Sequence, residues 1–248
     1  MSEWNADRMS IKPSWYSSEG KGKMADLLNL LHPPYTTWHL SYVLLGIALS
    51  PTIFPVRSAA ALIAFLLGLG IGAHALDETM GNPLNTKLSK TALYAIGFSA
   101  LAIAVSIGLY YVITLSILLL PIIIVESFFA VTYNLEMFHR RFHSTLVFAL
   151  SWGSIPFLTG YFVNTLAIGP AIVLMSFAVA LLTYVQKTLS TQARFIRRKI
   201  MAVDALRLSS GAHVPISSAE LISPAEKSLK ALTVMIFVVS IALILALH

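Results

Sequence analysis

Long apolar runs alternate with short polar stretches along most of the chain. A membrane-spanning helix needs roughly 20 mostly apolar residues, and the runs predict seven such helices, at residues 35–55, 57–76, 91–112, 114–134, 143–164, 167–187 and 227–247. Two other segments, near residues 21–32 and 190–207, place apolar side chains at helical spacing beside charged ones, which is typical of helices that lie on a membrane surface. The pattern predicts an all-α fold, a polytopic membrane helix bundle.

The polar segments divide the chain into four predicted parts. They are a cytoplasmic tail with an interfacial amphipathic helix (1–34), a six-span membrane core (35–187), a basic cytoplasmic amphipathic loop (188–226) and a seventh transmembrane helix (227–248). Ser223, Pro224 and Glu226 have the spacing of a helix N-cap, a first-turn proline and a capping glutamate. We therefore expect the last helix to begin there.

Composition and charge support a membrane location. Of the 248 residues, 57% are hydrophobic and 11% are charged, whereas soluble domains carry about 25% charged residues. If the N-terminus is cytoplasmic, all of the 17 lysine and arginine residues except Arg57 fall on the cytoplasmic side, as the positive-inside rule requires. We expect an integral protein of the plasma or cell membrane with a cytoplasmic N-terminus and an external C-terminus.

The charge and the lack of cysteine exclude some functions. The net charge of +6 could suggest a nucleic-acid partner, but the basic residues lie on one predicted membrane side, and no nucleic-acid-binding motif or basic-aromatic platform accompanies them. Nucleic acid is therefore not an expected partner. With no cysteine in the chain, disulfides, thiolate metal sites and cysteine nucleophiles are excluded.

The first candidate site lies at the end of the second predicted span. His74, Asp77 and Glu78 follow one another at i, i+3 and i+4, so a continuous helix places them on one face. Charged groups at membrane depth are costly and usually face a polar cavity. Two interpretations stay open: a divalent-cation or diphosphate site at the mouth of the bundle, or a helix end that interfacial water wets.

A second set of ionisable residues follows the fourth predicted span. Glu136, His139 and His143 are spaced i, i+3 and i+7 at the same predicted membrane depth. Together the two sets offer candidate metal ligands at His74, Asp77, Glu78, Glu136 and His143. Mixed carboxylate and imidazole ligands suit zinc, iron or manganese, whereas carboxylates with a substrate phosphate suit Mg²⁺. Contact of the histidines with lipid headgroups is the alternative.

One acid lies inside a predicted span. Glu126 is in the middle of the fourth span, and Tyr133 follows seven residues later on the same helical face. An intramembrane acid is a functional-site hypothesis by default, and a protonated structural hydrogen-bonding group is the alternative. We expect its partners in the first span, at His39, Ser41 or Tyr42.

Basic residues at the cytoplasmic boundary form a candidate phosphate site. Arginine guanidinium groups bind phosphate oxygens directly, and the candidates are Lys87, Arg141 and Arg194. Binding of anionic lipid headgroups, which is worth about 1 kcal/mol per basic residue, is the alternative.

The order of these motifs resembles the UbiA family of intramembrane prenyltransferases over about residues 30–190. Residues 32–46 are similar to the proline-containing entry of that family's first span, and residues 73–86 stand where its first aspartate-rich motif holds magnesium. Residues 133–141 resemble its later tyrosine and lysine motif. The second aspartate-rich motif is absent, because residues 184–194 contain no carboxylate.

The resemblance implies an all-helical enzyme of prenyl diphosphates. In it, Asp77 and Glu78 hold Mg²⁺, while Lys87, Arg141 and Arg194 neutralise the leaving diphosphate. Glu126 and Tyr133 face the acceptor or the carbocation. We therefore expect a divergent UbiA-like, Mg²⁺-dependent transferase or lyase that acts on a prenyl or lipid diphosphate among membrane lipids.

Two other functions stay open. One is a membrane oxidoreductase or hydrolase whose histidines and carboxylates bind iron, zinc or manganese. The other is a non-catalytic membrane subunit or lipid-binding module that keeps the fold without the chemistry. The missing second acidic motif favours this last alternative.

Overall fold

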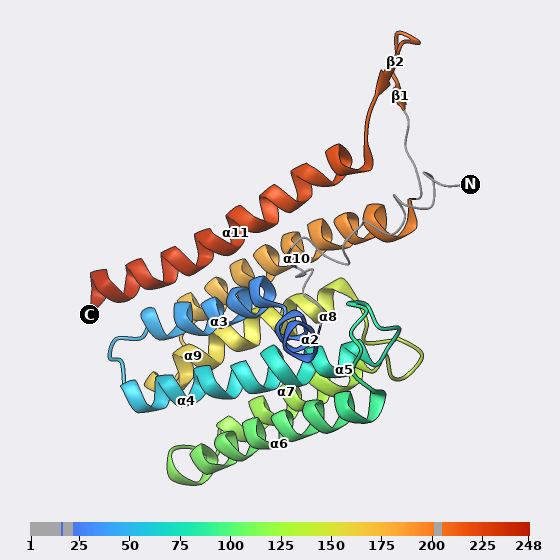
Figure 1. Ribbon diagram of the computed structural model, residues 1–248. Coiled ribbons are helices and arrows are strands. Elements are labelled where there is room, and N and C mark those ends of the chain that lie inside the picture. The colour runs from blue at the N-terminus through green and yellow to red at the C-terminus, as the bar shows by residue number, and fades with distance from the viewer. Residues whose placement is uncertain (1–15, 17–21, 201–204) are drawn as a thin grey trace.

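Helices make up most of the chain, as the apolar runs predict (Figure 1). The computed structural model describes residues 16, 22–200 and 205–248, so most of the predicted tail lies outside the described residues. The helices, in chain order, are α2 (Lys23–Leu30), α3 (Pro33–Ala48), α4 (Pro55–Phe65), η1 (Leu66–Ala73), α5 (His74–Glu78), α6 (Lys90–Thr114), α7 (Leu119–Asn134), α8 (Thr145–Ala149), η2 (Leu150–Ser154), α9 (Ile155–Thr165), α10 (Pro170–Lys199) and α11 (Ser218–Leu247).

Each predicted span coincides largely with a helix, although α3 ends at Ala48, before the predicted end of the first span at residue 55, and these helices confirm the all-α polytopic bundle. Five continuous helical segments are long and apolar enough to cross a membrane: Pro55–Glu78, Lys90–Thr114, Thr145–Thr165, Pro170–Lys199 and Ser218–Leu247. The other two, α3 and α7, have 16 residues each. The protein is therefore an integral membrane protein, while the number of seven crossings stays a prediction.

The crossing of α3 and α9 forms the centre of the bundle. A Cβ atom on Gly46 would collide with the backbone of Phe157, and one on Gly160 would collide with the backbone of Val43. Only glycine lets two helix backbones approach so closely, as in many membrane helix pairs. Phe157 is fully buried beside Tyr42. Helix α11 also packs against α3, and Pro33 is the one exposed residue of α3.

Two helices contain a π-helical stretch. η1 joins α4 to α5, and η2 joins α8 to α9, so each forms part of one continuous helical segment. Stretches with π-type hydrogen bonding occur frequently at functional sites. Here η1 directly precedes His74 and Asp77, and η2 contains Trp152.

The start of the last helix differs from the prediction. α11 begins at Ser218, because Ser217 forms the capping box with Glu220: the Glu220 N–H donates to Ser217 Oγ at 3.2 Å, and the Ser217 N–H donates to the Glu220 carboxylate at 2.7 Å. The predicted start at Ser223 is wrong, since the upstream serine and glutamate have the same spacing, and Pro224 lies within the helix.

A small hairpin connects the last two helices. β1 (Ala205–Arg207) pairs antiparallel with β2 (His213–Pro215), and Figure 1 shows this hairpin projecting beyond the ends of α10 and α11. All residues of both strands are exposed. The predicted basic loop thus contains the continuation of α10 to Lys199, the hairpin and the first turns of α11.

Candidate functional site

A cavity of about 110 Å³ lies near the end of the bundle where α5 and α7 end, and we call it the polar cavity. Its lining comes from α3, α5, α7, α8, η2 and α10, from the loops that follow α5 and α7, and from Tyr16 and His32 before α3. It brings ionisable side chains from distant parts of the chain together. Its charged members and histidines are Asp77, Lys187, Arg194, Arg198, His32, His39, His74 and His143.

Helix α10 supplies the positive charge of the polar cavity. Lys187, Arg194 and Arg198 are spaced seven and four residues apart, so they project from one helical face. Lys187 Nζ donates a hydrogen bond to the Tyr133 hydroxyl at 2.7 Å and lies 4.4 Å from the centre of the Phe148 ring. Aromatic faces therefore stabilise this ammonium group.

Asp77 is the one carboxylate among the described residues that line the polar cavity. It is close enough to interact electrostatically with His74, Lys187 and Arg198. Arg198 also donates a hydrogen bond to the Pro83 carbonyl at 2.9 Å, which connects α10 to the loop after α5. Because three cationic side chains accompany one acid, the cavity favours an anionic ligand.

Two stacked histidines form part of the wall. The rings of His32 and His74 have centroids 4.3 Å apart and are inclined by 17°. His32 Nδ1 shares a hydrogen bond of 2.6 Å with the Tyr16 hydroxyl. Burial lowers the pKa of His32 well below its usual 6.5, and the nearby His74, Arg194 and Arg198 lower it further. His32 is therefore neutral at pH 7, which suits its stacking on a second imidazole.

Aromatic rings form another wall. Tyr133 stacks on His143 with centroids 4.3 Å apart and lies 4.7 Å from Trp152, and Phe148 stacks on Trp152 at 5.3 Å. Burial lowers the pKa of His143, although its hydrogen bond with the Tyr133 carbonyl acts in the opposite direction. A cavity with cations on one helix and aromatic rings beside them suits a ligand with an anionic head and an apolar body.

The polar cavity gathers some of the predicted site residues and not others. Those that line it are His74, Asp77, Tyr133, His143 and Arg194, and those that do not are Glu78, Lys87, Glu126, Glu136 and Arg141. In the part of the chain that the structure describes, no group of three or more histidine, aspartate or glutamate side chains is arranged to hold a metal ion. The predicted ligands therefore do not form a metal site from protein groups alone.

Two of the predicted carboxylate ligands have other partners. Glu78 is buried, and its carboxylate accepts hydrogen bonds from the Leu84 N–H at 3.0 Å and from the Thr86 N–H and hydroxyl at 3.1 and 2.9 Å. Glu136 pairs with Arg140 at 3.2 Å. Glu78 thus fixes the loop after α5, and Glu136 belongs to a pair at the protein surface.

The predicted partners of Glu126 are wrong. The three side chains form other hydrogen bonds: His39 Nδ1 with the Trp152 carbonyl, Ser41 Oγ with the Thr37 carbonyl, and the Tyr42 hydroxyl with Thr183 Oγ1. The reason is that α3 packs chiefly against α9 and α11. Glu126 lies instead beside a separate cavity between other helices.

Sequence reasoning left some residues of the polar cavity unassigned. Lys187 was not among the phosphate-binding candidates, and it shares a face with Arg194 and Arg198 only if the sixth predicted span continues as one helix beyond residue 187, as α10 does. The spacing of seven and four residues between these three cations was the feature of the sequence that could have identified the face they share. The contacts of His32 and His39 with distant residues had no equivalent signal in the sequence.

Comparisons with known proteins address the fold. No protein-family model and no curated protein matches the sequence. Two solved structures of a UbiA homologue from Archaeoglobus fulgidus do match. One, bound to Cd²⁺, has a TM-score of 0.53 and 16% sequence identity, and the match covers 90% of this chain and 85% of that one. The other, bound to DMAPP and Mg²⁺, has a TM-score of 0.52 and 16% identity, with 90% and 84% covered.

The protein is thus an all-α integral membrane helix bundle, with a cavity near one end that basic side chains line. More specifically, it has a UbiA-type fold, which confirms the distant resemblance expected from the order of the sequence motifs.

Proposed function

We propose that the polar cavity binds the diphosphate of a prenyl or lipid diphosphate, and that the protein is a divergent Mg²⁺-dependent transferase or lyase. The observation that carries this proposal is the set of three cations on α10, Lys187, Arg194 and Arg198, which line one cavity with Asp77. The similar Archaeoglobus structure bound to DMAPP and Mg²⁺ supports the same ligand class.

The cations and the aromatic rings have separate roles in this proposal. The guanidinium groups of Arg194 and Arg198 bind phosphate oxygens in fork geometry. Lys187 adds a third positive charge at the leaving group. Tyr133 and Trp152 contact the apolar chain next to the diphosphate, where aromatic faces also stabilise developing positive charge.

The residues present fit Mg²⁺ only together with a phosphate ligand. Asp77 offers one carboxylate, because both oxygens of Glu78 already accept hydrogen bonds from the loop after α5. Mg²⁺ is commonly held by one or two carboxylates, water and substrate phosphate oxygens rather than by a cage of protein ligands. Asp77 would hold the ion, which supplies positive charge to the diphosphate when bound.

We also propose that the polar cavity opens toward the cytoplasm. Lys187, Arg194 and Arg198 belong to the basic residues that lie on the predicted cytoplasmic side, and Arg57 is the lone exception on the other side. The N-terminus is then cytoplasmic and the C-terminus external. A water-soluble diphosphate head would reach the cavity from the cytoplasm, while its apolar chain stays in the membrane.

A non-catalytic lipid-diphosphate-binding role is a second candidate. Residues 184–194 carry no carboxylate where the family resemblance calls for the second aspartate-rich motif, so tight binding without turnover fits the same residues. The transition-metal alternative lacks a comparable observation, because the described residues contain no group of three metal-ligating side chains.

The test is binding and turnover of dimethylallyl diphosphate by the full chain in lipid nanodiscs, with Mg²⁺ or with a chelator. Arg194→Ala and Arg198→Ala should each weaken binding about tenfold, the order expected for one lost charge-assisted contact. Asp77→Asn should remove the Mg²⁺ dependence.

Lys199→Ala is the matched control, because it removes an exposed cation of the same helix that does not line the cavity. It should bind like the unmodified protein. Binding that is the same in Arg194→Ala, Arg198→Ala and Lys199→Ala would reject the proposed site. Binding without turnover on any acceptor would support the non-catalytic candidate.

A further inference from the structure

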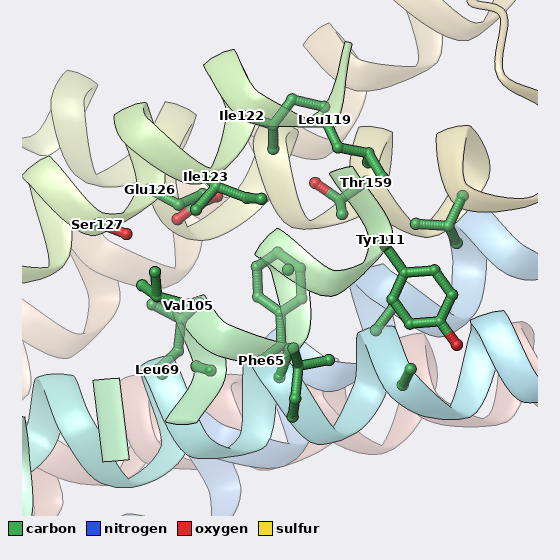
Figure 2. A pocket seen from close by; sticks show the side chains of 18 of the residues that line it. Phe65, Leu69, Val105, Tyr111, Leu119, Ile122, Ile123, Glu126, Ser127 and Thr159 are labelled. Atoms are coloured by element: carbon green, nitrogen blue, oxygen red, sulfur yellow. The ribbon is translucent and has the colours of Figure 1, made fainter. Parts of the chain in front are cut away.

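A second cavity, also of about 110 Å³, lies between α4 with η1, α6, α7 and α9, and we call it the apolar pocket. Figure 2 shows Glu126 and Ser127 toward one end of it and Tyr111 toward the other, with Phe65 and aliphatic side chains between them. Small residues at intervals of four, Ala60, Ala64 and Gly68, form one side. The surrounding helices are apolar, so a ligand of this pocket must dissolve in the membrane.

Glu126 gives the apolar pocket one specific chemical feature. Its Oε1 atom is buried without a hydrogen-bond partner among the described residues, and neither carboxylate oxygen forms an ion pair there. Arg57 also lines the pocket, but its guanidinium group lies 4.1 Å over the Phe54 ring. A buried polar group without a partner costs roughly 1–3 kcal/mol. A ligand that supplies the missing hydrogen bond would recover part of this cost.

A packed layer separates the apolar pocket from the polar cavity. Leu69 lines the apolar pocket, and Tyr133 and Trp152 line the polar cavity. All three belong to one buried cluster, each with at most 4% of its surface exposed. The apolar pocket is therefore a second site and not an extension of the diphosphate site.

We infer that the apolar pocket binds an uncharged, membrane-soluble molecule with an apolar body and one hydroxyl group, which hydrogen-bonds to Glu126. Without an ion-pair partner among the described residues, a carboxyl group at membrane depth is most stable as the neutral acid. A neutral acid both donates and accepts hydrogen bonds, and a hydroxyl group does the same. A charged amine is a poorer fit, because an ion pair in apolar surroundings must offset the desolvation of both charges.

The experiment uses the full chain in lipid nanodiscs and a hexadecanol probe that carries a photoreactive diazirine in mid-chain. After illumination, mass spectrometry of peptides locates the attached probe. We expect attachment to peptides that contain residues 60–68, 104–108 or 122–127. The matching hexadecane and hexadecylamine probes, with the same diazirine, should give at least fivefold less attachment there.

Variants of the pocket separate specific binding from general contact with lipid. Glu126→Leu should reduce attachment of the alcohol probe at least fivefold, and Glu126→Gln, which keeps both hydrogen-bonding functions, should retain it. Gly68→Val should also reduce attachment by filling the pocket. At Gly68 a Cβ atom would meet only Ala104 Cβ, at 3.6 Å, so the fold tolerates added volume there, and Gly68→Ala provides a smaller step.

Gly169→Val is the matched control, since a Cβ atom at Gly169 meets nothing within 4 Å and lies outside the pocket. It should leave attachment unchanged. Equal attachment of the alcohol and hydrocarbon probes, preference for the amine, or attachment insensitive to both Glu126→Leu and Gly68→Val would overturn the inference. Binding of dimethylallyl diphosphate should be unchanged in Gly68→Val, so this result does not depend on the proposed function.

Discussion

The polar cavity and the apolar pocket have the same volume, about 110 Å³ each, but the surroundings of their acidic residues differ. Asp77 in the polar cavity is accompanied by three cations on α10 and by four histidines. Glu126 beside the apolar pocket has no partner among the described residues. The volume of these two cavities therefore says little about which ligand each one binds. What distinguishes them is the number of polar and charged groups around the acid: many in the anion-binding site, and few in the site for one neutral polar group.

The largest expected effect comes from removing the layer between the two cavities. Trp152 is 3% exposed and packs with Leu69 and Tyr133, so Trp152→Ala should lower the free energy of unfolding by about 3–5 kcal/mol. Reversible unfolding in mixed detergent micelles measures it. Phe177→Ala removes an aromatic ring that is 57% exposed and should change little. A loss below about 1 kcal/mol in Trp152→Ala would show that packing in this layer contributes little to stability.

Glu78→Ala tests whether the acid next to Asp77 is structural. Its carboxylate accepts three hydrogen bonds from Leu84 and Thr86. Leaving those donors unpaired should cost about 2–3 kcal/mol and speed amide hydrogen exchange at residues 84–86. Asp77→Asn should leave both quantities nearly unchanged. Equal destabilisation by the two substitutions would contradict the separate roles assigned to these neighbours.

Lowering the pH should reduce the free energy of unfolding, because buried histidines line the polar cavity. Burial holds the pKa of His32 well below 6.5 in the folded state, while the unfolded chain regains a value of about 6.5. The unfolded state therefore binds more protons between these values. This stability is present above pH 6.5 and is lost as the pH is lowered from about 6.5 toward 5, by at most about 1.4 kcal/mol per pH unit for one group.

Unfolding temperatures measured across this pH range check the effect. His32→Asn should reduce the slope, because asparagine tolerates the positive φ of 46° at this position and does not titrate. His143, whose pKa is also lowered by burial, contributes in the same direction. A slope unchanged in His32→Asn would mean that other groups cause the acid sensitivity.

The smallest effect is expected at Glu136, which sequence spacing made a metal-ligand candidate. Its pair with Arg140 is partly exposed, with 26% and 61% of the two side chains accessible, and exposed pairs contribute about 0–1 kcal/mol. Glu136→Gln should therefore change stability by less than about 0.5 kcal/mol and leave binding of dimethylallyl diphosphate with Mg²⁺ intact. Loss of Mg²⁺-dependent binding in this variant would indicate that Glu136 is a metal ligand.

The sequence predicted the bundle well because apolar length is a local property. Each predicted span falls on a helix, and the order of motifs was enough to indicate the UbiA-type fold. Asp77, Tyr133 and Arg194, each at the predicted end of an apolar run, were expected at a common depth, and they line one cavity. Their convergence on one cavity became visible only when the helices were placed side by side.

What the sequence missed depends on contacts between distant segments. Glu78 has the spacing of a metal ligand, but the loop that follows it bends back and uses its carboxylate. The partners of Glu126 were misplaced because helix adjacency is not encoded in hydrophobic periodicity. Lys187 was overlooked since a positive residue at the end of a span normally needs no explanation beyond topology.

The wider turn of η1 has a consequence for comparing this protein with its structural relatives. In a regular α-helix one residue corresponds to about 100° of rotation, and a π-type turn arises from an extra residue within the helix. Removing one residue from Leu66–Ala73 would therefore swing Asp77 to a different side of its helix. In a relative without this bulge, the residue that occupies the position of Asp77 in space lies one place earlier relative to the start of the helix. An alignment across this segment must therefore insert a one-residue gap in that relative.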